Sequence, residues 1–152
     1  MFTVTRYHDI SAGHRVLGHE GKCQFMHGHN YRIHFQCAID GNNEKLDSVG
    51  RVIDFSLIKN ILCQWLEEHW DHRFLMYYRD PMLSALIEID ETVVATPFNP
   101  TAENMAKFLV QNVAPVLLEG TGAYLLSCTV EETRKCSATW TEEQKTKCEP
   151  NF

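Results

Sequence analysis

The segment KCQFMHGHNY places Cys23, His27 and His29 within seven positions. His27 and His29 stand two apart where a strand pattern begins, so their side chains share one face and can reach a single ion. A third ligand must come from elsewhere, and the nearest candidates are His14 and His19. Three histidines leave one tetrahedral position open, as in a catalytic zinc site. H-x-H pairs also occur on strands that bind no metal, so the spacing leaves both possibilities open.

Cys23 stands four residues before His27, and three roles are open to it. It can be a fourth zinc ligand that closes the site, or a free thiol whose pKa is lowered by nearby positive charge. An inert buried thiol is the commoner case in general, but the polar residues around Cys23 favour it less. Cys37, Cys63 and Cys128 lie on apolar faces and are predicted to pack in the core.

Asp71 and His72 are adjacent where a predicted helix ends. A carboxylate beside an imidazole fixes its tautomer and raises its pKa, which suits proton transfer. Adjacent Asp-His pairs are common, so the pair alone is weak evidence for a function. His69 shares the apolar stripe of the same helix and is predicted to pack.

Glu132 continues an alternating pattern in the segment AYLLSCTVEE. Tyr124, Leu126, Cys128 and Val130 have the same parity, so a regular strand ends its core-facing row on this carboxylate. Burying an unpaired carboxylate is costly, so Glu132 requires a partner. An internal arginine or a ligand rich in N–H donors would serve.

The elements that position these residues follow from hydrophobic periodicity. Strands are predicted over residues 2–10 and 30–40, and amphipathic helices begin near Phe55 and within PFNPTAEN, the second kinked or ended by Pro115. GTGAYLLSCTVEE and KCSATW predict a closing pair of strands, and TVVAT is ambiguous. This order predicts an α+β fold with antiparallel strands and both helices packed on one face of the sheet.

Each helix has two candidate N-caps. Asp54 or Ser56 can cap the first helix. In the second, either Asn99 is the cap and a proline takes the first helical position, or Thr101 is the cap. Glu103 then lies in the first turn, where an acidic side chain interacts favourably with the helix dipole.

The totals describe an ordinary globular chain. Its 152 residues are 44% hydrophobic and 22% charged, and they predict one domain over 1–152 with a polar tail from about residue 141. The net charge of −6 argues weakly against a nucleic-acid partner. No apolar run reaches membrane-spanning length and no signal peptide is evident, so we expect no membrane partner, a cytoplasmic location and free thiols. Cys136 and Cys148 receive no predicted role.

Several segments together resemble one family. SAGHRV, CQFMHGHNY, VIDFSLIK, WDHRFL, NPTAEN and VEETRKCSATW occur in this order and resemble the 6-pyruvoyltetrahydropterin synthase / 6-carboxytetrahydropterin synthase family. The resemblance extends to about residue 140 and is most specific in C-x-x-x-H-G-H-N-Y. It implies the tunnelling fold, a four-stranded antiparallel sheet with two helices on one face. It also implies trimeric barrels that usually stack into a homohexamer.

The resemblance implies a zinc cofactor and separate roles within CQFMHGHNY. The zinc ligands would be His14, His27 and His29. Cys23 would be the catalytic thiol beside the metal, not a ligand. His19 matches no ligand of the family.

Further positions are implied in the same way. Asp71 and His72 would form a second proton-transfer group. Glu132 would anchor the pterin by accepting hydrogen bonds from its ring N–H and amino groups, which are the donors that a core-facing carboxylate requires. Thr101 and Glu103 resemble positions that line the pterin pocket.

The implied substrate is 7,8-dihydroneopterin triphosphate. The three residues between Cys23 and His27 resemble the bacterial queuosine-pathway enzymes, which implies 6-carboxy-5,6,7,8-tetrahydropterin as the product, with release of acetaldehyde and triphosphate. The alternatives are a 6-pyruvoyltetrahydropterin synthase, another tunnelling-fold enzyme and a non-catalytic zinc- or pterin-binding module. An asparagine that often follows Asp-His in the family is absent, and Gly13 stands where alanine or a small polar residue is usual, which we expect to be tolerated.

Overall fold

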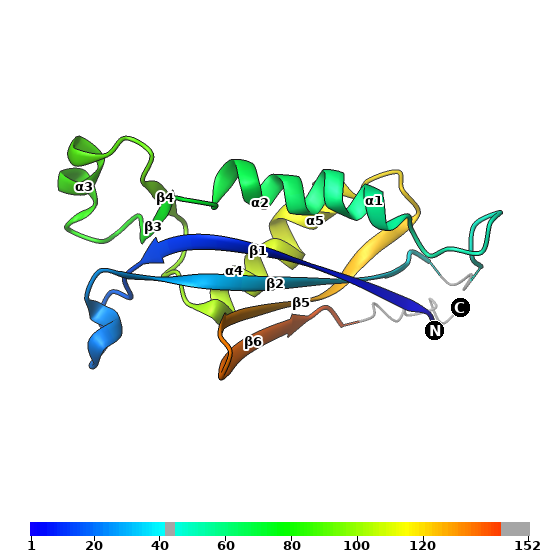
Figure 1. The fold of residues 1–152 in the computed structure, drawn as a ribbon, viewed down its shortest axis with the longest axis horizontal. Helices are drawn as coiled ribbons and strands as arrows, with labels where there is room; N and C mark the ends of the chain where they lie inside the picture. Colours follow the sequence, from blue (N-terminus) through cyan, green and yellow to red (C-terminus); the bar gives the residue numbers. More distant parts are fainter. Residues whose placement is uncertain (42–44, 144–152) are drawn as a thin grey trace, which may run out of the picture.

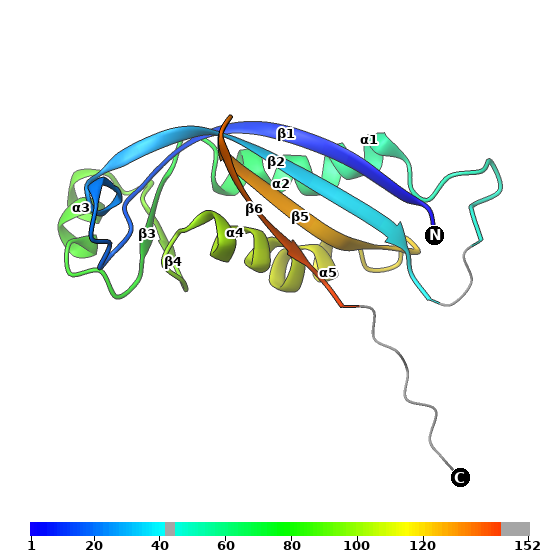
Figure 2. The same cartoon turned by 90° about the horizontal axis from the view of Figure 1, so that it is seen from below.

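The computed structural model describes residues 1–41 and 45–143, and its curled sheet holds the helices on its concave side (Figures 1 and 2). The strands are β1 (Thr3–His14), β2 (His27–Ile39), β3 (Phe74–Tyr77), β4 (Val94–Thr96), β5 (Ala123–Thr133) and β6 (Cys136–Thr141). They lie in the order β4-β3-β1-β2-β5-β6. Strands β1, β2, β5 and β6 pair antiparallel, as predicted.

The expected sheet of four strands is wrong, because the sheet has six. Strand β3 pairs parallel with β1, and β4 pairs parallel with β3. With four and three residues, these strands are too short to show a period of two. The ambiguous segment TVVAT contains β4.

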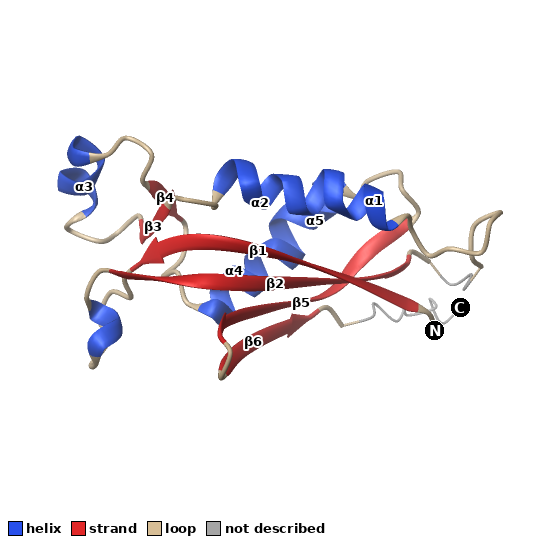
Figure 3. Ribbon diagram, viewed as in Figure 1, coloured by secondary structure: helices blue, strands red, loops and turns tan. Residues whose placement is uncertain are grey.

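Two helical runs cover the sheet. The first consists of α1 (Phe55–Ile58), the π-helical segment η2 (Lys59–Cys63) and α2 (Gln64–His69). The second consists of α4 (Ala102–Phe108), the π-helical segment η3 (Leu109–Val113) and α5 (Ala114–Leu117). The 3-10 turn η1 (Lys22–Gln24) and helix α3 (Leu83–Ile89) are separate, and Figure 3 shows α3 apart from both runs. The sequence patterns did not predict α3.

Side-chain caps fix where the two runs begin. The Asp54 carboxylate accepts a hydrogen bond from the Ser56 amide at 2.7 Å, so Asp54 is the cap of the first run. The Thr101 hydroxyl accepts from the Asn104 amide at 3.2 Å, so Thr101 is the cap of the second and Asn99 is not. The second run ends at Leu117, two residues after Pro115.

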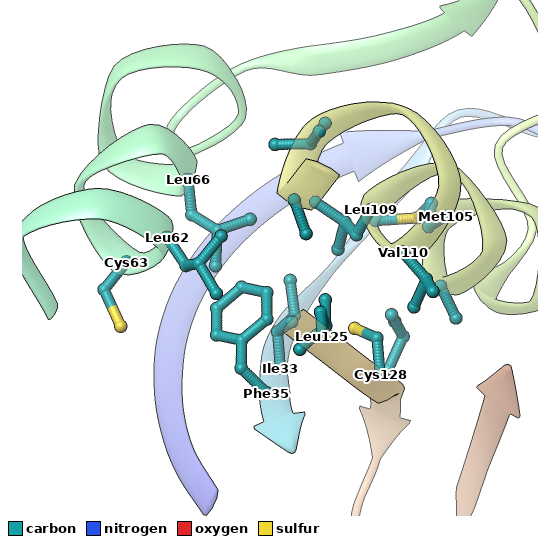
Figure 4. Packing of buried hydrophobic residues seen from close by; sticks show 14 of the residues in the cluster. Ile33, Phe35, Leu62, Cys63, Leu66, Met105, Leu109, Val110, Leu125 and Cys128 are labelled. Atoms are coloured by element: carbon teal, nitrogen blue, oxygen red, sulfur yellow. The ribbon is translucent and has the colours of Figure 1, made fainter. Parts of the chain in front are cut away.

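The core lies between β1, β2, β5 and the two runs (Figure 4). Ile33 and Phe35 of β2 face Leu62 and Leu66 of the first run and Leu109 of the second. All five side chains are almost completely buried. This packing holds the sheet rigidly and leaves the ends of β1 and β2 nearest β3 to carry polar residues.

A bulge changes which residues of β5 face the core. Opposite Gln36 and Cys37 the register of β5 shifts by one residue, so Leu125 lies opposite Cys37. Cys128 and Val130 face the core, as predicted. Between the start of β5 and the bulge, it is Leu125 that faces the core. The predicted alternation is therefore wrong for Tyr124, which is half-buried.

Three thiols lie in the core as predicted. Cys37, Cys63 and Cys128 are buried, and burial raises the pKa of each. Cys136 is exposed, and Cys148 lies outside the described residues. The predicted tail is described only as far as residue 143, and β6 occupies its first residue. In the described part of the chain, no helix is long and apolar enough to span a bilayer.

Candidate metal centre and active site

Three histidines meet where β1 ends and β2 begins. His14 is the last residue of β1 and lies directly opposite His27, the first residue of β2. His29 follows two residues later on the same face, and the three rings lie 4.5–5.1 Å apart between centroids. One nitrogen from each lies within 4.8 Å of the other two. His19 is not in this group, and its Nδ1 accepts a hydrogen bond from the Gly21 amide.

Backbone carbonyls orient two of the rings. The Nδ1 atom of His14 lies 2.6 Å from the Pro100 carbonyl oxygen, and that of His27 lies 2.7 Å from the Phe25 carbonyl oxygen. A carbonyl only accepts, so Nδ1 carries the proton in both rings. Burial lowers the pKa of His14 to about 4, against the opposing effect of the Pro100 carbonyl. Neutral rings in this tautomer present Nε2 lone pairs.

These lone pairs point at each other. The Nε2 atoms of His14 and His27 are 3.1 Å apart, where two acceptors repel unless a cation lies between them. Tetrahedral zinc with bonds of 2.0–2.1 Å requires nitrogens about 3.3 Å apart. His29 Nε2 is buried and has no hydrogen-bond partner among the described residues, and burial also lowers the pKa of His29. The donor set therefore fits a zinc ion with three nitrogen ligands.

Glu132 ends the core-facing row of β5 beside this group. One oxygen, Oε1, lies 3.3 Å from Nε2 of His14 and 3.3 Å from Nε2 of His29. The sequence predicts an arginine or a ligand as the partner of Glu132. The structure instead places two imidazoles beside its carboxylate. Because His14 Nε2 carries a lone pair, it cannot donate to the carboxylate. Glu132 thus places a negative charge beside the histidine group.

Cys23 lies in η1 and is half-buried. Its carbonyl accepts a hydrogen bond from the Val16 amide at 2.8 Å, which folds the loop between β1 and β2 back on itself. Its sulfur is not among the atoms that converge within 4.8 Å. This geometry argues against Cys23 as a fourth ligand.

Asp71 and His72 face each other beyond the end of α2. The Asp71 carboxylate lies 2.8 Å from His72 Nδ1 and accepts from the Ser11 amide at 2.9 Å. His72 has a positive φ of 57°, and its amide donates to the Ser11 carbonyl at 2.7 Å. Burial alone would raise the pKa of Asp71, but the hydrogen bonds from Ser11 and His72 outweigh it and lower that pKa. His69 is exposed and stacks on Trp65.

His72 borders a cavity of about 630 Å³ that His27 and His29 also line. Cys23 and Glu132 are not among its lining residues. Within the described chain, no hydrogen bond joins Cys23 to His72. Within a single chain, the histidine group and Glu132 are therefore in contact. The Asp71-His72 pair is held separately, bound to β1 through Ser11.

The segment NPTAEN contains residues that sequence reasoning missed. Asn99 binds the backbone of Leu17 twice, with Oδ1 accepting at 3.0 Å and Nδ2 donating at 2.8 Å. Pro100 supplies the carbonyl that orients His14. Thr101 uses its hydroxyl as the helix cap, and Glu103 is exposed in the first turn. Asn99 could have been identified in the sequence by its residue type. The role of the Pro100 carbonyl could not, because every residue carries a backbone carbonyl.

Gly13 is required where tolerance was expected. A β-carbon on Gly13 would lie 2.5 Å from the Phe74 ring, because β3 docks here. The Gly13 amide donates to the Arg73 carbonyl at 2.9 Å. Only glycine lets the ring approach the backbone so closely.

Solved structures with this arrangement define the class. An uncharacterised protein from Wolinella succinogenes has a TM-score of 0.79 at 22% identity, over 93% of this chain and 98% of that protein. The 6-pyruvoyl tetrahydropterin synthase of Caenorhabditis elegans has a TM-score of 0.65 at 23% identity, over 93% of this chain and 96% of that one. The chain therefore has the tunnelling fold.

Sequence comparison then gives the family. The family model of 6-pyruvoyl tetrahydropterin synthase matches residues 3–143. A Rickettsia felis relative named 6-carboxy-5,6,7,8-tetrahydropterin synthase is 37% identical over 138 residues, 90% of this chain and 97% of that protein. A Halobacterium salinarum relative, named as a probable enzyme of the same kind, is 37% identical over 85% of this chain and 79% of that protein. The chain belongs to the 6-pyruvoyl tetrahydropterin synthase family.

Proposed function

We propose that this chain is a zinc-dependent 6-carboxy-5,6,7,8-tetrahydropterin synthase. It would convert 7,8-dihydroneopterin triphosphate to that product and release acetaldehyde and triphosphate, in the queuosine pathway. The observation that carries the proposal is the convergence of three imidazole nitrogens, two with their lone pairs fixed by carbonyls. Relatives at 34–37% identity that bear this enzyme's name support the choice of product.

The proposed zinc ligands are His14, His27 and His29. A zinc ion held there supplies Lewis acidity toward hydroxyl groups of the substrate side chain. The Pro100 and Phe25 carbonyls keep two ligand rings in the correct tautomer and orientation.

Cys23 and the Asp71-His72 pair are the proposed proton-transfer groups. Asp71 holds the proton of His72 on Nδ1, which leaves Nε2 of the exposed ring free to accept a proton from substrate. The Cys23 thiol lies in a separate loop, which supports proton transfer from a second side of the substrate. The two groups then move protons between neighbouring carbons of the side chain.

Glu132 is the proposed pterin anchor. Its carboxylate accepts no hydrogen bond from the described residues, so its acceptor capacity is available to ring N–H groups. Thr101 and Glu103 are proposed to line the pterin pocket. A cytoplasmic homohexamer of two trimers remains part of the proposal.

Incubation of the zinc-loaded protein with 7,8-dihydroneopterin triphosphate tests the reaction. Mass spectrometry should detect 6-carboxytetrahydropterin together with acetaldehyde. A pyruvoyl product would instead assign the biopterin-type reaction, and no triphosphate release would leave a non-catalytic binding module. The Cys23→Ala chain, loaded with zinc in the same way, is the matched control.

A further inference from the structure

Tyr31 is a buried phenol that borders the histidine group and has no assigned role. Its side chain is fully buried, and its ring contacts His14 and His29 edge-to-face at 5.9 and 5.4 Å between centroids. It follows His27 and His29 on the same face of β2, with Ile10 of β1 opposite. Tyr31 therefore separates the polar centre from the apolar core.

The Tyr31 hydroxyl is a donor without an acceptor. Its oxygen is buried and has no hydrogen-bond partner among the described residues. A buried hydroxyl left unpaired is costly, so native structures rarely keep one without a reason.

Glu132 is the complementary case, an acceptor without a donor. Arg32 pairs with Glu131 in the ladder between β2 and β5, so Tyr31 and Glu132 are the next residues on the two strands and face the same side. The imidazole nitrogens near the carboxylate are occupied when they hold a metal. The side chain of Glu132 is 25% exposed, and the phenol of Tyr31 on the neighbouring strand is a donor that no described residue uses.

We propose that Tyr31 is a positioning residue whose O–H donates a hydrogen bond to the Glu132 carboxylate and aims its second oxygen at the N–H groups of the pterin. The two groups are not hydrogen-bonded in the ligand-free chain, so the bond forms when the pterin binds: the phenol then holds one carboxylate oxygen while the other accepts from the ring N–H groups, and the buried hydroxyl gains a bond to a charged acceptor. The inference rests on the proposed function, since it concerns how that site holds its substrate.

A double-mutant cycle tests this coupling, with neopterin as a probe that does not react. Tyr31→Phe keeps the ring and removes the hydroxyl, and should weaken neopterin binding about tenfold, the effect of one hydrogen bond to a charged group. In a Glu132→Ala background, which leaves the hydroxyl no side-chain acceptor at this position, the same change should have an effect of less than about twofold. Tyr124→Phe, on the far end of β5, is the control and should bind as the wild type does.

Two outcomes would overturn the proposal. Unchanged affinity in Tyr31→Phe would show that the hydroxyl does not act on the site, and an undiminished tenfold loss in the Glu132→Ala background would show that it acts without Glu132. Failure of the zinc-loaded wild type to bind neopterin would instead contradict the proposed function. A merely structural hydroxyl would lower the melting temperature of the ligand-free Phe variant, whereas we expect that temperature to be unchanged or higher.

An NMR measurement covers the case in which the Phe variant does not fold. The ¹³Cζ resonance of Tyr31 in the zinc-loaded wild type should move on addition of neopterin, as the phenol gains its acceptor. In Glu132→Ala, which offers the phenol no side-chain acceptor, the resonance should remain in place. A Tyr31 resonance that stays in place in both proteins when neopterin is added would contradict the proposal.

Discussion

At the scale of single residues, the site consists of groups whose protonation is fixed by neighbours. His14 and His27 donate from Nδ1 to carbonyls, and burial keeps His14 neutral. Spacing predicted the pairing of His27 with His29, because a strand alternates strictly. The spacing did not distinguish His14 from His19 as the third ligand. Residues 15–26 form the loop between β1 and β2, and hydrophobic periodicity does not predict the path of a loop.

Cys23→Ala should retain zinc and lose most turnover. The Cys23 sulfur is outside the converging group, so removing it leaves three nitrogen ligands in place. Zinc content measured by elemental analysis, beside turnover of the triphosphate, checks both parts. Loss of zinc together with the thiol would make Cys23 a ligand and contradict its assignment.

Glu132→Ala should weaken pterin binding by about 2 kcal/mol or more, the cost of losing charged hydrogen bonds. Titration of the zinc-loaded protein with neopterin measures this loss. Glu131→Ala is the matched control, because Glu131 lies on the opposite face beside His34. Equal affinities of the Glu132 variant and the wild type would show that Glu132 is structural.

At the scale of elements, β3 and the end of α2 attach to the β1 edge through backbone contacts. Ser11 binds the Asp71 carboxylate and the His72 amide, and Gly13 accommodates Phe74. The long antiparallel strands and both amphipathic runs could be predicted, since each repeats its pattern over several residues. Strands β3 and β4 could not, because a parallel strand of three or four residues is specified by its partners.

Gly13→Ala should destabilise the fold by about 1–3 kcal/mol, because the added methyl group collides with the Phe74 ring. Urea unfolding monitored by circular dichroism measures the change. Replacing Phe74 by leucine in the same chain should recover part of the loss. A Gly13→Ala chain as stable as the wild type would show that β3 can shift to accommodate the methyl group without loss of unfolding free energy.

The Asp71 carboxylate should make stability depend on pH. Its pKa is lowered in the folded chain, so its contribution is present above the unfolded value near 3.8 and is lost as pH falls through the folded value. The difference in unfolding free energy between wild type and Asp71→Asn should therefore be constant from about pH 7 to 5 and shrink below about pH 4. A difference that grows on acidification would mean that the pKa is raised.

At the scale of the whole molecule, the sheet presents an open edge at β6 and another at β4. Unpaired strand edges favour joining to other strands. This supports the proposed homohexamer, for which light scattering should give about six times the chain mass of 17.6 kDa. A monomer at micromolar concentration would contradict that assembly. The assembly could not be derived from hydrophobic periodicity, because an open edge is a property of pairing in space.

The proposed zinc site has three imidazole ligands and no thiolate. X-ray absorption at the zinc edge of the wild-type protein measures it directly. We expect a shell of nitrogen or oxygen atoms at about 2.0–2.1 Å, with no sulfur at about 2.3 Å. A sulfur shell, or a chain that retains no zinc after loading, would contradict it.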